Sequence, residues 1–209
     1  MLKRDALKKS GIYAILDIKT CHKKNTTKLT QNLLKNNIKI IQLRDKDSAW
    51  QEVLRKAYRL KKIINDKALL IINDFPQICI LTGASGVHLG QKDLSLKFAR
   101  KILGDNKIIG ISCHNIKQAE RAQRNGADYI GFGPIFKTPT KKYCKPIGTK
   151  EIGILKKKVK IPFFLIGGID TQQLKTIKSH KINRIAVCRA LCQAKDLNKK
   201  IRQLRSYLN

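Results

Sequence analysis

Long hydrophobic stretches are missing from this sequence of 209 residues. The longest apolar runs, such as Ala68–Ile72 and Ile161–Ile166, fall far short of the roughly 20 residues that a membrane-spanning helix requires. The first ten residues are charged and lack the apolar segment of a secretory signal. The sequence therefore predicts a soluble, cytoplasmic protein that has no membrane as a partner.

Paired cysteines are missing as well. The six cysteines are scattered, without a Cys-x-x-Cys pair, and in a cytoplasmic chain of this size free thiols are favoured over disulfides. Cys113 and His114 are adjacent, so they cannot easily ligate one ion from a strand, which disfavours a zinc site. Cys188 and Cys192 stand four residues apart and could share a helix face.

Acidic residues are scarce: 14 Asp and Glu stand against 45 Lys and Arg, giving a formal net charge of +31. Such an excess raises nucleic-acid binding as a function of a different class. The lysines, however, are spread along the whole chain rather than gathered in one stripe, and the few aromatic residues are not interleaved with them as a base-stacking surface requires. We interpret most of these charges as solvated faces and expect no specific nucleic-acid partner.

Linkers, low-complexity blocks and exact internal repeats are also missing. A chain of this length fits one parallel α/β barrel, which commonly uses about 200 to 250 residues. The sequence therefore predicts a single domain over residues 1–209, with residues 1–10 as a charged N-terminal lead-in. It leaves open whether the domain forms a homo-oligomer.

What the chain does contain is a regular alternation of apolar runs and amphipathic segments. The predicted strands are Gly11–Leu16, Lys39–Leu43, Ala68–Ile72, Ser85–Leu89, Lys107–Ile111, Ala127–Ile130, Ile161–Ile166 and Ile182–Val187. The predicted helices are Thr27–Asn36, Ser48–Asn65 with Ser48 as N-cap, Pro76–Leu81, Leu94–Leu103 ended by Gly104, Asn115–Asn125, Gly148–Lys157, Thr171–Ser179 and Lys195–Leu208. Eight such units predict the α/β class and a closed (β/α)8 TIM barrel rather than an open doubly wound sheet.

The stretch Gly131–Lys141, with the sequence GFGPIFKTPTK, directly follows one of the predicted strands. Two glycines and Pro134 interrupt the strand pattern, and two threonines then stand beside lysines. Hydrogen-bond donors beside positive charge suit a phosphate group, although a plain basic surface turn would carry the same residues. We interpret this stretch as an anion-binding loop.

In such a barrel the carboxyl ends of all strands point to one face, so residues just after the strands meet there. Polar side chains and glycines occupy these positions in most of the units. They are Gln42, Arg44 and Lys46 after the second strand, Asn73 and Asp74 after the third, Asp93 after the fourth, Ser112 after the fifth, Gly167-Gly168 after the seventh and Cys188-Arg189 after the eighth. The sequence therefore predicts the functional site at this face.

Two carboxylates, Asp74 and Asp93, stand among the basic residues of this set. Mg²⁺ prefers oxygen ligands and usually takes one or two carboxylates plus water and substrate phosphates, so the pair predicts Mg²⁺ as cofactor. Capping of a helix or turn is the alternative role for each. Arg44, Lys46 and Lys141 would supply the opposing charge for a diphosphate.

Gly167-Gly168 exposes backbone N–H groups close to a predicted helix start, which suits a phosphate monoester. His88 and His114 are interpreted as hydrogen-bonded structural histidines rather than as bases.

Six short segments, taken in order, form a specific pattern. They are QLRDK (42–46), IND (72–74), GVHLGQKD (86–93), GISCH (110–114), GADYIGFGPIFKTPTK (126–141) and IGGI (166–169). Together they resemble the thiamine-phosphate synthase family from about Gly11 to Leu191. The resemblance implies a (β/α)8 barrel and a transferase of thiamine biosynthesis, which joins hydroxymethylpyrimidine diphosphate to a thiazole phosphate. It would release pyrophosphate and, with the carboxylated thiazole, carbon dioxide.

The resemblance also implies roles for individual residues. The pyrimidine diphosphate would be held by Gln42, Leu43, Arg44, Asp45, Lys46, Asn73, Ser112 and Lys141, of which Arg44, Lys46, Ser112 and Lys141 would be catalytic. The thiazole phosphate would be held by Thr138, Pro139, Thr140, Gly168, Cys188 and Arg189, and Mg²⁺ by Asp74 and Asp93. In this family the diphosphate leaves first and the thiazole nitrogen captures the resulting cation, so catalysis is mainly electrostatic and needs no general base.

This chain departs from the family pattern near the eighth strand. The family usually has Gly-Ala-Asp-Gly before that strand and a small hydroxyl residue after it, whereas this chain has Lys181-Ile182-Asn183-Arg184 and then Arg189. Ser85 also stands where the family tends to have an acid. The nearest rival function is that of the related thiazole tautomerase, which needs no diphosphate–Mg²⁺ site; retention of Asn73, Asp74, Asp93 and Lys141 favours the synthase.

Overall fold

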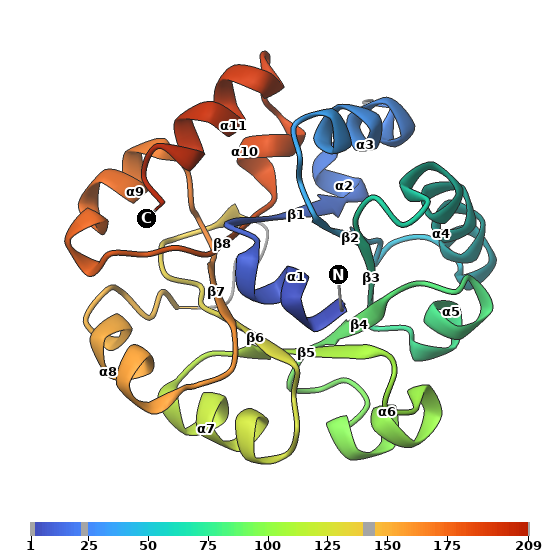
Figure 1. The fold of residues 1–209 in the computed structure, drawn as a ribbon, viewed down its shortest axis with the longest axis horizontal. Coiled ribbons are helices and arrows are strands. Elements are labelled where there is room, and N and C mark those ends of the chain that lie inside the picture. Colours follow the sequence, from blue (N-terminus) through green and yellow to red (C-terminus); the bar gives the residue numbers. More distant parts are fainter. Residues whose placement is uncertain (1–2, 22–24, 140–144, 209) are drawn as a thin grey trace.

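The structure, a computed structural model, describes residues 3–21, 25–139 and 145–208. Eight parallel strands form a closed barrel in which each strand pairs with the next in sequence and β8 pairs with β1 (Figure 1). The strands are β1 Ile12–Asp17, β2 Ile40–Arg44, β3 Leu69–Asn73, β4 Gly86–Leu89, β5 Ile108–Cys113, β6 Tyr129–Phe132, β7 Phe163–Ile166 and β8 Ile185–Val187. The predicted (β/α)8 barrel is confirmed.

Helices lie around the barrel, apart from α1, which lies across the middle of the ring of strands in Figure 1. They are α1 Lys3–Lys9, α2 Ile18–Cys21, α3 Thr26–Lys35, α4 Trp50–Ile64, α5 Pro76–Leu81, α6 Leu96–Leu103, α7 Ile116–Arg124, α8 Glu151–Lys158, α9 Thr171–Thr176, the 3₁₀ turn η2 Lys178–His180, α10 Arg189–Cys192 and α11 Leu197–Arg205. All eight predicted helices occur, with shifted ends. Three short helices, α1, α2 and α10, were not predicted. Within the described residues, no helix is long and apolar enough to cross a membrane.

Two layers of buried side chains hold the fold together. One lies between the strands and the outer helices, and the other fills the barrel with inward-facing residues such as Tyr13, Ile71 and Phe164. Side chains along each strand belong alternately to the two layers, because successive side chains point to opposite faces of the sheet. This alternation decides which polar residues face the barrel interior.

Helix α1 closes the amino-terminal end of the barrel, where it lies across the ring of strands in Figure 1. Its residues Ala6 and Leu7 are buried in the interior cluster. Arg184, which stands at the end of the segment that departs from the family pattern, donates from Nη1 to the Lys8 carbonyl at 3.0 Å. Its Nε also donates to the Phe163 carbonyl at 3.3 Å. The charged N-terminal segment therefore has a packing role.

Helix α4 begins without a capping side chain, because its N-cap residue is Ala49 and not the predicted Ser48. The preceding turn is organised by Asp45, whose side chain is almost fully buried and accepts from the backbone N–H of Ser48 at 3.2 Å. Lys56 of α4 donates to the Asp45 carboxylate at 2.6 Å and to the Ser48 hydroxyl at 2.8 Å. The prediction was wrong by one residue because this tertiary ion pair replaces a local cap.

Burial alone would raise the pKa of Asp45, but the hydrogen bonds from Lys56 and Ser48 outweigh it and lower the pKa below its ordinary value. The stabilisation is therefore present above the unfolded-state pKa of about 3.9 and is lost as the pH falls through the lower folded-state pKa. We expect Asp45→Asn to lower the free energy of unfolding by about 2 kcal/mol at neutral pH. Urea unfolding of variant and parent should give stabilities that converge as the pH is lowered through the folded-state pKa of Asp45.

The control for this prediction is Glu52→Gln, which removes a carboxylate from the exposed Glu52–Arg55 pair on the same helix. An exposed pair of this kind contributes less than about 1 kcal/mol. Equal losses in the two variants, or a loss in Asp45→Asn that persists unchanged in acid, would contradict the assigned role of Asp45.

Candidate active site

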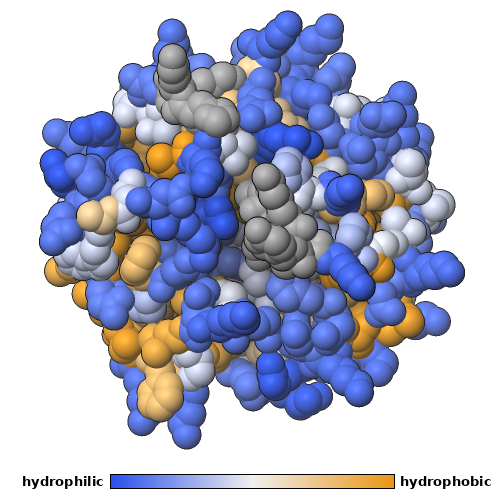
Figure 2. Space-filling view, turned by 180° about the vertical axis from the view of Figure 1, so that it is seen from behind, coloured by the Kyte–Doolittle hydropathy of each residue, from blue (hydrophilic) through white to orange (hydrophobic). Residues whose placement is uncertain are grey.

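The polar residues that follow the strands meet at the barrel face opposite α1. Figure 2 shows this face, on which hydrophilic residues surround the centre of the molecule. A cavity of about 590 Å³ opens here and is walled mainly by the segments that follow β6, β7 and β8. A smaller cavity of about 50 Å³ lies deeper among the inward-facing side chains. Arg44 and Ser112 line both cavities, so the two adjoin.

Arg44 projects from the end of β2 and is held by Asp17, which ends the paired strand β1. The Asp17 carboxylate is buried, forms an ion pair with the Arg44 guanidinium and accepts from the backbone N–H of Thr20 at 2.8 Å. The guanidinium is therefore fixed at the junction of the two cavities. A fixed guanidinium suits a phosphate oxygen.

Asn73 ends β3 and is almost fully buried, yet its Nδ2 has no hydrogen-bond partner within residues 3–21, 25–139 and 145–208. A buried donor without a partner is costly, so such a group is expected to serve a ligand. Asn73 lines the inner cavity together with Gln42 and Ser112. The three amide and hydroxyl side chains thus surround one small space.

Asp74 and Asp93 are brought together, as the sequence predicted, and their side chains hydrogen-bond to each other. Asp74 adopts a left-handed backbone conformation with φ of 65°, and its carboxylate pairs with Lys46 Nζ at 2.7 Å. Burial, and then the neighbouring Asp93, raises the pKa of Asp74 in spite of Lys46. Two carboxylates in contact must share a proton or a cation, so the donor set fits a divalent cation completed by water and phosphate oxygens.

The pair does not form a complete metal cage. Within the described part of the chain, no three His, Cys, Asp or Glu side chains gather in a way that could hold a metal. Asp93 also accepts from the backbone N–H of Gly90 at 2.6 Å. This bond caps a turn, which is the role that the sequence offered as an alternative to metal binding. A site of two carboxylates is typical of Mg²⁺, whose remaining coordination positions are usually filled by water and substrate phosphates.

The stretch Gly131–Lys141 begins with the last two residues of β6, and residues 135 and 136 then lie along the carboxyl end of β7. The backbone N–H groups of Ile135 and Phe136 donate to the carbonyls of Ile166 and Gly167 at 2.9 and 3.0 Å. A Cβ on Gly168, whose φ is 66°, would lie 2.6 Å from the Lys137 carbonyl, so only glycine fits there. This close packing places Thr138 and Gly168 in the wall of one cavity.

Cys188 and Arg189 complete the wall of the larger cavity from the end of β8. The hydrogen bond with Cys192, together with burial, raises the pKa of the Cys188 thiol far above its ordinary value. The thiol is therefore neutral at pH 7 and is a poor nucleophile. Arg189 lines the same cavity as Gly168, and its positive charge is in keeping with an anionic ligand.

Several predicted residues line neither cavity, and Lys46, Asp74 and Asp93 are among them. Leu43 belongs to the outer hydrophobic layer, and Asp45 is engaged in the turn before α4, so neither side chain points to the site. Pro139 is exposed and is not part of either cavity wall. Thr140 and Lys141 lie outside the described residues.

Sequence reasoning missed several residues that shape the site. Asp17 positions Arg44, and two buried tyrosines, Tyr13 and Tyr129, line the inner cavity beside His88. His88 is hydrogen-bonded through both ring nitrogens, and His114 Nδ1 bonds to the Gly133 carbonyl at 2.5 Å. The period-two pattern of β1 places residues 13, 15 and 17 on one face. This pattern was the signal that could have identified Tyr13 and Asp17 from the sequence.

Comparisons with known proteins agree with this geometry. Residues 12–191 match the family model described as thiamine monophosphate synthase. Among curated relatives, the thiamine-phosphate synthases of Clostridioides difficile and Fusobacterium nucleatum are 34% and 37% identical to this chain. The first alignment covers 96% of this chain and 97% of the Clostridioides difficile protein. The second covers 97% of this chain and 99% of the Fusobacterium nucleatum protein.

A third relative is longer than this chain. The thiamine-phosphate synthase of Prochlorococcus marinus subsp. pastoris is 37% identical over 191 residues, which are 91% of this chain and 53% of the relative. This chain therefore spans about half the length of that relative.

Solved structures give the same result. Thiamine phosphate pyrophosphorylase from Pyrococcus furiosus superposes with a TM-score of 0.85 at 28% identity, covering 96% of both chains. A 3-hexulose-6-phosphate synthase superposes with a TM-score of 0.66 at 17% identity, over 95% of this chain and all of the other, and shows only that the barrel is shared. The family model, which matches from β1 to α10, and the relatives that align over nearly the whole chain show that this protein belongs to the thiamine monophosphate synthase family.

Proposed function

We propose that this protein is a transferase that moves a hydroxymethylpyrimidine group from its diphosphate to a thiazole phosphate, giving thiamine phosphate and pyrophosphate. With a carboxylated thiazole, carbon dioxide is released as well. The observation that carries the proposal is the pair of adjoining cavities with Arg44 in both walls. The inner one is lined by neutral polar and aromatic side chains, and the outer one by glycines, hydroxyl groups and cations.

In the proposed arrangement the pyrimidine ring occupies the inner cavity among Gln42, Asn73 and Ser112, and its diphosphate emerges beside Arg44 and Lys46. Asn73 Nδ2, the buried donor without a partner in the described chain, would donate to a diphosphate oxygen. The thiazole phosphate occupies the outer cavity against Thr138, Gly168 and Arg189. The predicted loop roles of Thr140 and Lys141 belong to this proposal and rest on the sequence.

The reaction breaks the bond between the pyrimidine methylene carbon and the diphosphate oxygen, and the electron pair leaves with the diphosphate. The lone pair of the thiazole nitrogen then forms the new carbon–nitrogen bond. The Arg44 guanidinium, already fixed by Asp17, and the Lys46 ammonium stabilise the charge that grows on the departing oxygen. No general base is required, which agrees with the poorly nucleophilic thiol of Cys188 and the fully hydrogen-bonded ring of His88.

Mg²⁺, held by Asp74 and Asp93, would supply further positive charge to the diphosphate oxygens. Lys46 already occupies the Asp74 carboxylate at 2.7 Å. A divalent cation on the Asp74 and Asp93 carboxylates would compete with Lys46 for Asp74, and the Lys46 ammonium would then be available to a diphosphate oxygen.

The purified protein should form thiamine phosphate from the two precursors when Mg²⁺ is added. Product formation followed by chromatography, with and without a chelator, is the direct measurement. Arg44→Ala should slow the coupling by about 100-fold or more, because it removes a fixed charge that is matched to the transition state. Isomerisation of the thiazole without any coupled product would instead indicate a tautomerase.

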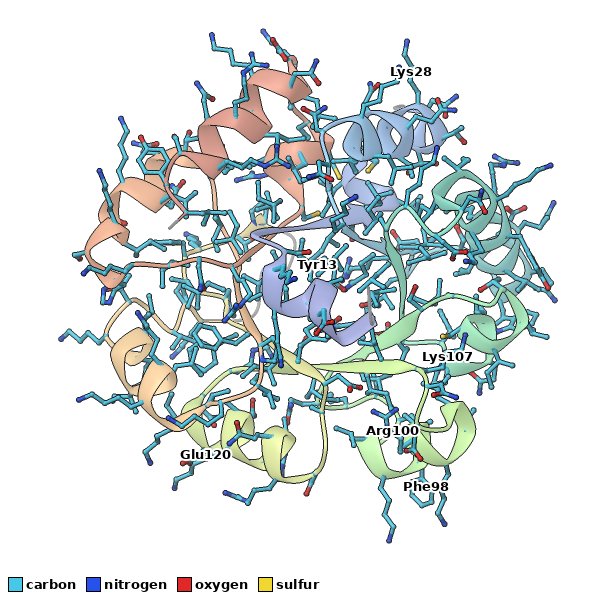
Figure 3. All side chains as sticks on the ribbon, viewed as in Figure 1. Tyr13, Lys28, Phe98, Arg100, Lys107 and Glu120 are labelled. Atoms are coloured by element: carbon cyan, nitrogen blue, oxygen red, sulfur yellow. The ribbon has the colours of Figure 1, made fainter. Side chains whose placement is uncertain are left out.

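The two cavities predict that single changes affect one substrate each. Asn73→Ala should raise the KM for the pyrimidine diphosphate about tenfold, and Arg189→Ala should do so for the thiazole phosphate, since each removes one hydrogen bond to a charged group. Steady-state kinetics with each substrate varied in turn measures the split. Lys28→Ala is the control, because Lys28 points into solvent from α3 on the outside of the barrel (Figure 3). Equal effects of either variant on both substrates would contradict the division.

Removal of either carboxylate should weaken the binding of Mg²⁺. In Asp74→Asn and in Asp93→Asn, the Mg²⁺ concentration for half-maximal activity should rise about tenfold or more. Glu120→Gln, a change of the same kind on α7 beside Lys158, should leave it unchanged. A metal dependence of Asp74→Asn that matches Glu120→Gln would remove Asp74 from the metal site.

A further inference from the structure

A continuous chain of hydrogen bonds crosses the barrel interior beneath the candidate active site. Gln42 Nε2 donates to the Tyr13 hydroxyl at 2.6 Å, and the hydroxyls of Tyr13 and Tyr129 lie 2.9 Å apart. The Tyr129 hydroxyl lies 3.0 Å from His88 Nδ1, and His88 Nε2 lies 2.9 Å from the Ser112 hydroxyl. The chain thus joins Gln42 to Ser112, the two ends that are predicted to contact the pyrimidine.

The surrounding structure makes room for this chain. A Cβ on Gly110 would lie 2.0 Å from Cζ of the Tyr129 ring, so a side chain at that position would displace the ring. Phe164 packs edge-on against the rings of Tyr13 and Tyr129, with centroids 5.3 and 5.8 Å apart. In Figure 3, Tyr13 lies within the ring of strands. The five polar groups are therefore held in place by packing as well as by their own bonds.

The hydrogen bonds of this chain all run in one direction. Burial raises the pKa of both tyrosines above the ordinary value, so each hydroxyl keeps one hydrogen to donate. The Gln42 amide nitrogen can only donate, and within the described residues the Tyr13 hydroxyl has Tyr129 as its other partner, so only a bond to the Tyr129 oxygen satisfies the Tyr13 hydrogen. Tyr129 in turn gives its hydrogen to Nδ1 of His88, which must then be unprotonated. The hydrogen of the neutral imidazole is therefore on Nε2 and is donated to the Ser112 oxygen.

The two ends of the chain are consequently coupled. With Nε2 of Gln42 used by Tyr13, the amide oxygen is left to accept from a ligand. With its oxygen accepting from His88, the Ser112 hydroxyl is left to donate. A flipped Gln42 amide would reverse every bond, because Tyr13 would then donate to it and His88 would carry its hydrogen on Nδ1. One amide orientation thus corresponds to one histidine tautomer.

We propose that Tyr13, Tyr129 and His88 are positioning residues that fix the hydrogen-bonding polarity of the inner cavity. They present an acceptor at Gln42 and a donor at Ser112, both of which line that cavity. This polarity selects a heteroaromatic ring with an amino group beside a ring nitrogen, since the amino group donates to Gln42 and the nitrogen accepts from Ser112. The identity of the ring as the substrate pyrimidine rests on the proposed function, whereas the direction of the chain does not.

The direction is tested on the free protein by NMR of histidine labelled with nitrogen-15 at neutral pH. His88 should be neutral with its hydrogen on Nε2. In Tyr13→Phe the link from Gln42 to Tyr129 is lost, so Tyr129 can either donate to Nδ1 or accept from it, and the resonances should show a mixture of tautomers. In Tyr129→Phe the donor to Nδ1 is lost, and the resonances should show a mixture of tautomers. A parent protein whose His88 carries its hydrogen on Nδ1, or is doubly protonated, would overturn the proposal.

The functional consequence is tested by the same two variants in the coupling assay. Both keep the aromatic ring and its packing, and both free the Gln42 amide to flip. Each should raise the KM for the pyrimidine diphosphate about tenfold, corresponding to one hydrogen bond of about 1.4 kcal/mol, and leave the KM for the thiazole phosphate unchanged. The double variant should be no worse than Tyr129→Phe alone, because both changes break one chain.

Tyr58→Phe is the matched control, since the exposed Tyr58 hydroxyl bonds only outside the barrel, to the Leu81 carbonyl at 2.8 Å. It should change neither KM. Equal increases in both KM values for the barrel variants would mean a general structural defect and would overturn the positioning role. If the parent formed no thiamine phosphate, the proposed function would fail, while the NMR result would still decide the direction of the chain.

Discussion

Closure of the barrel between β1 and β8 is the constraint on which the rest of the structure depends. Because all neighbouring strands are parallel, closure brings eight carboxyl ends to one face and leaves the other end to be sealed. The site lies at the carboxyl-end face. Helix α1 covers the opposite end through buried Leu7, and Arg184 holds the helix there by donating to the Lys8 and Phe163 carbonyls. Arg184 therefore lies at the sealing end, whereas Arg189 lines the larger cavity at the other end.

Much of this arrangement could be predicted from the sequence. The apolar runs located all eight strands to within about three residues. The rule that strand ends meet at one barrel face predicted that Arg44 and Asn73 lie together, and both line the inner cavity. Asp74 and Asp93, 19 positions apart in the chain, do form a contacting pair. The strand positions could be predicted because strand periodicity is a property of the local sequence. The meeting of strand ends could be predicted because it is a property of the fold class.

The remaining features depend on tertiary contacts that no local pattern encodes. Asp45 belongs to the QLRDK segment, which the family resemblance assigned to the pyrimidine diphosphate. Its side chain instead binds Lys56 and stabilises the start of α4. Asp17 has no motif of its own and acquires a role only because β1 pairs with β2 in the register that sets it beside Arg44. Leu43 likewise sits inside the QLRDK segment and faces the outer layer, as strand alternation requires.

The site separates two kinds of recognition along the barrel axis. Charged groups stand at the rim, where Arg44 and Lys46 are each paired with a carboxylate. Below them the groups are neutral, since burial keeps the tyrosines protonated and the chain of bonds requires a neutral His88. A charge at that depth would be expensive to desolvate, whereas a neutral chain costs little once every member is bonded. In the proposed function, recognition of the ring would therefore be buried, while charge stabilisation would remain at the rim, where a diphosphate and a cation would enter and leave.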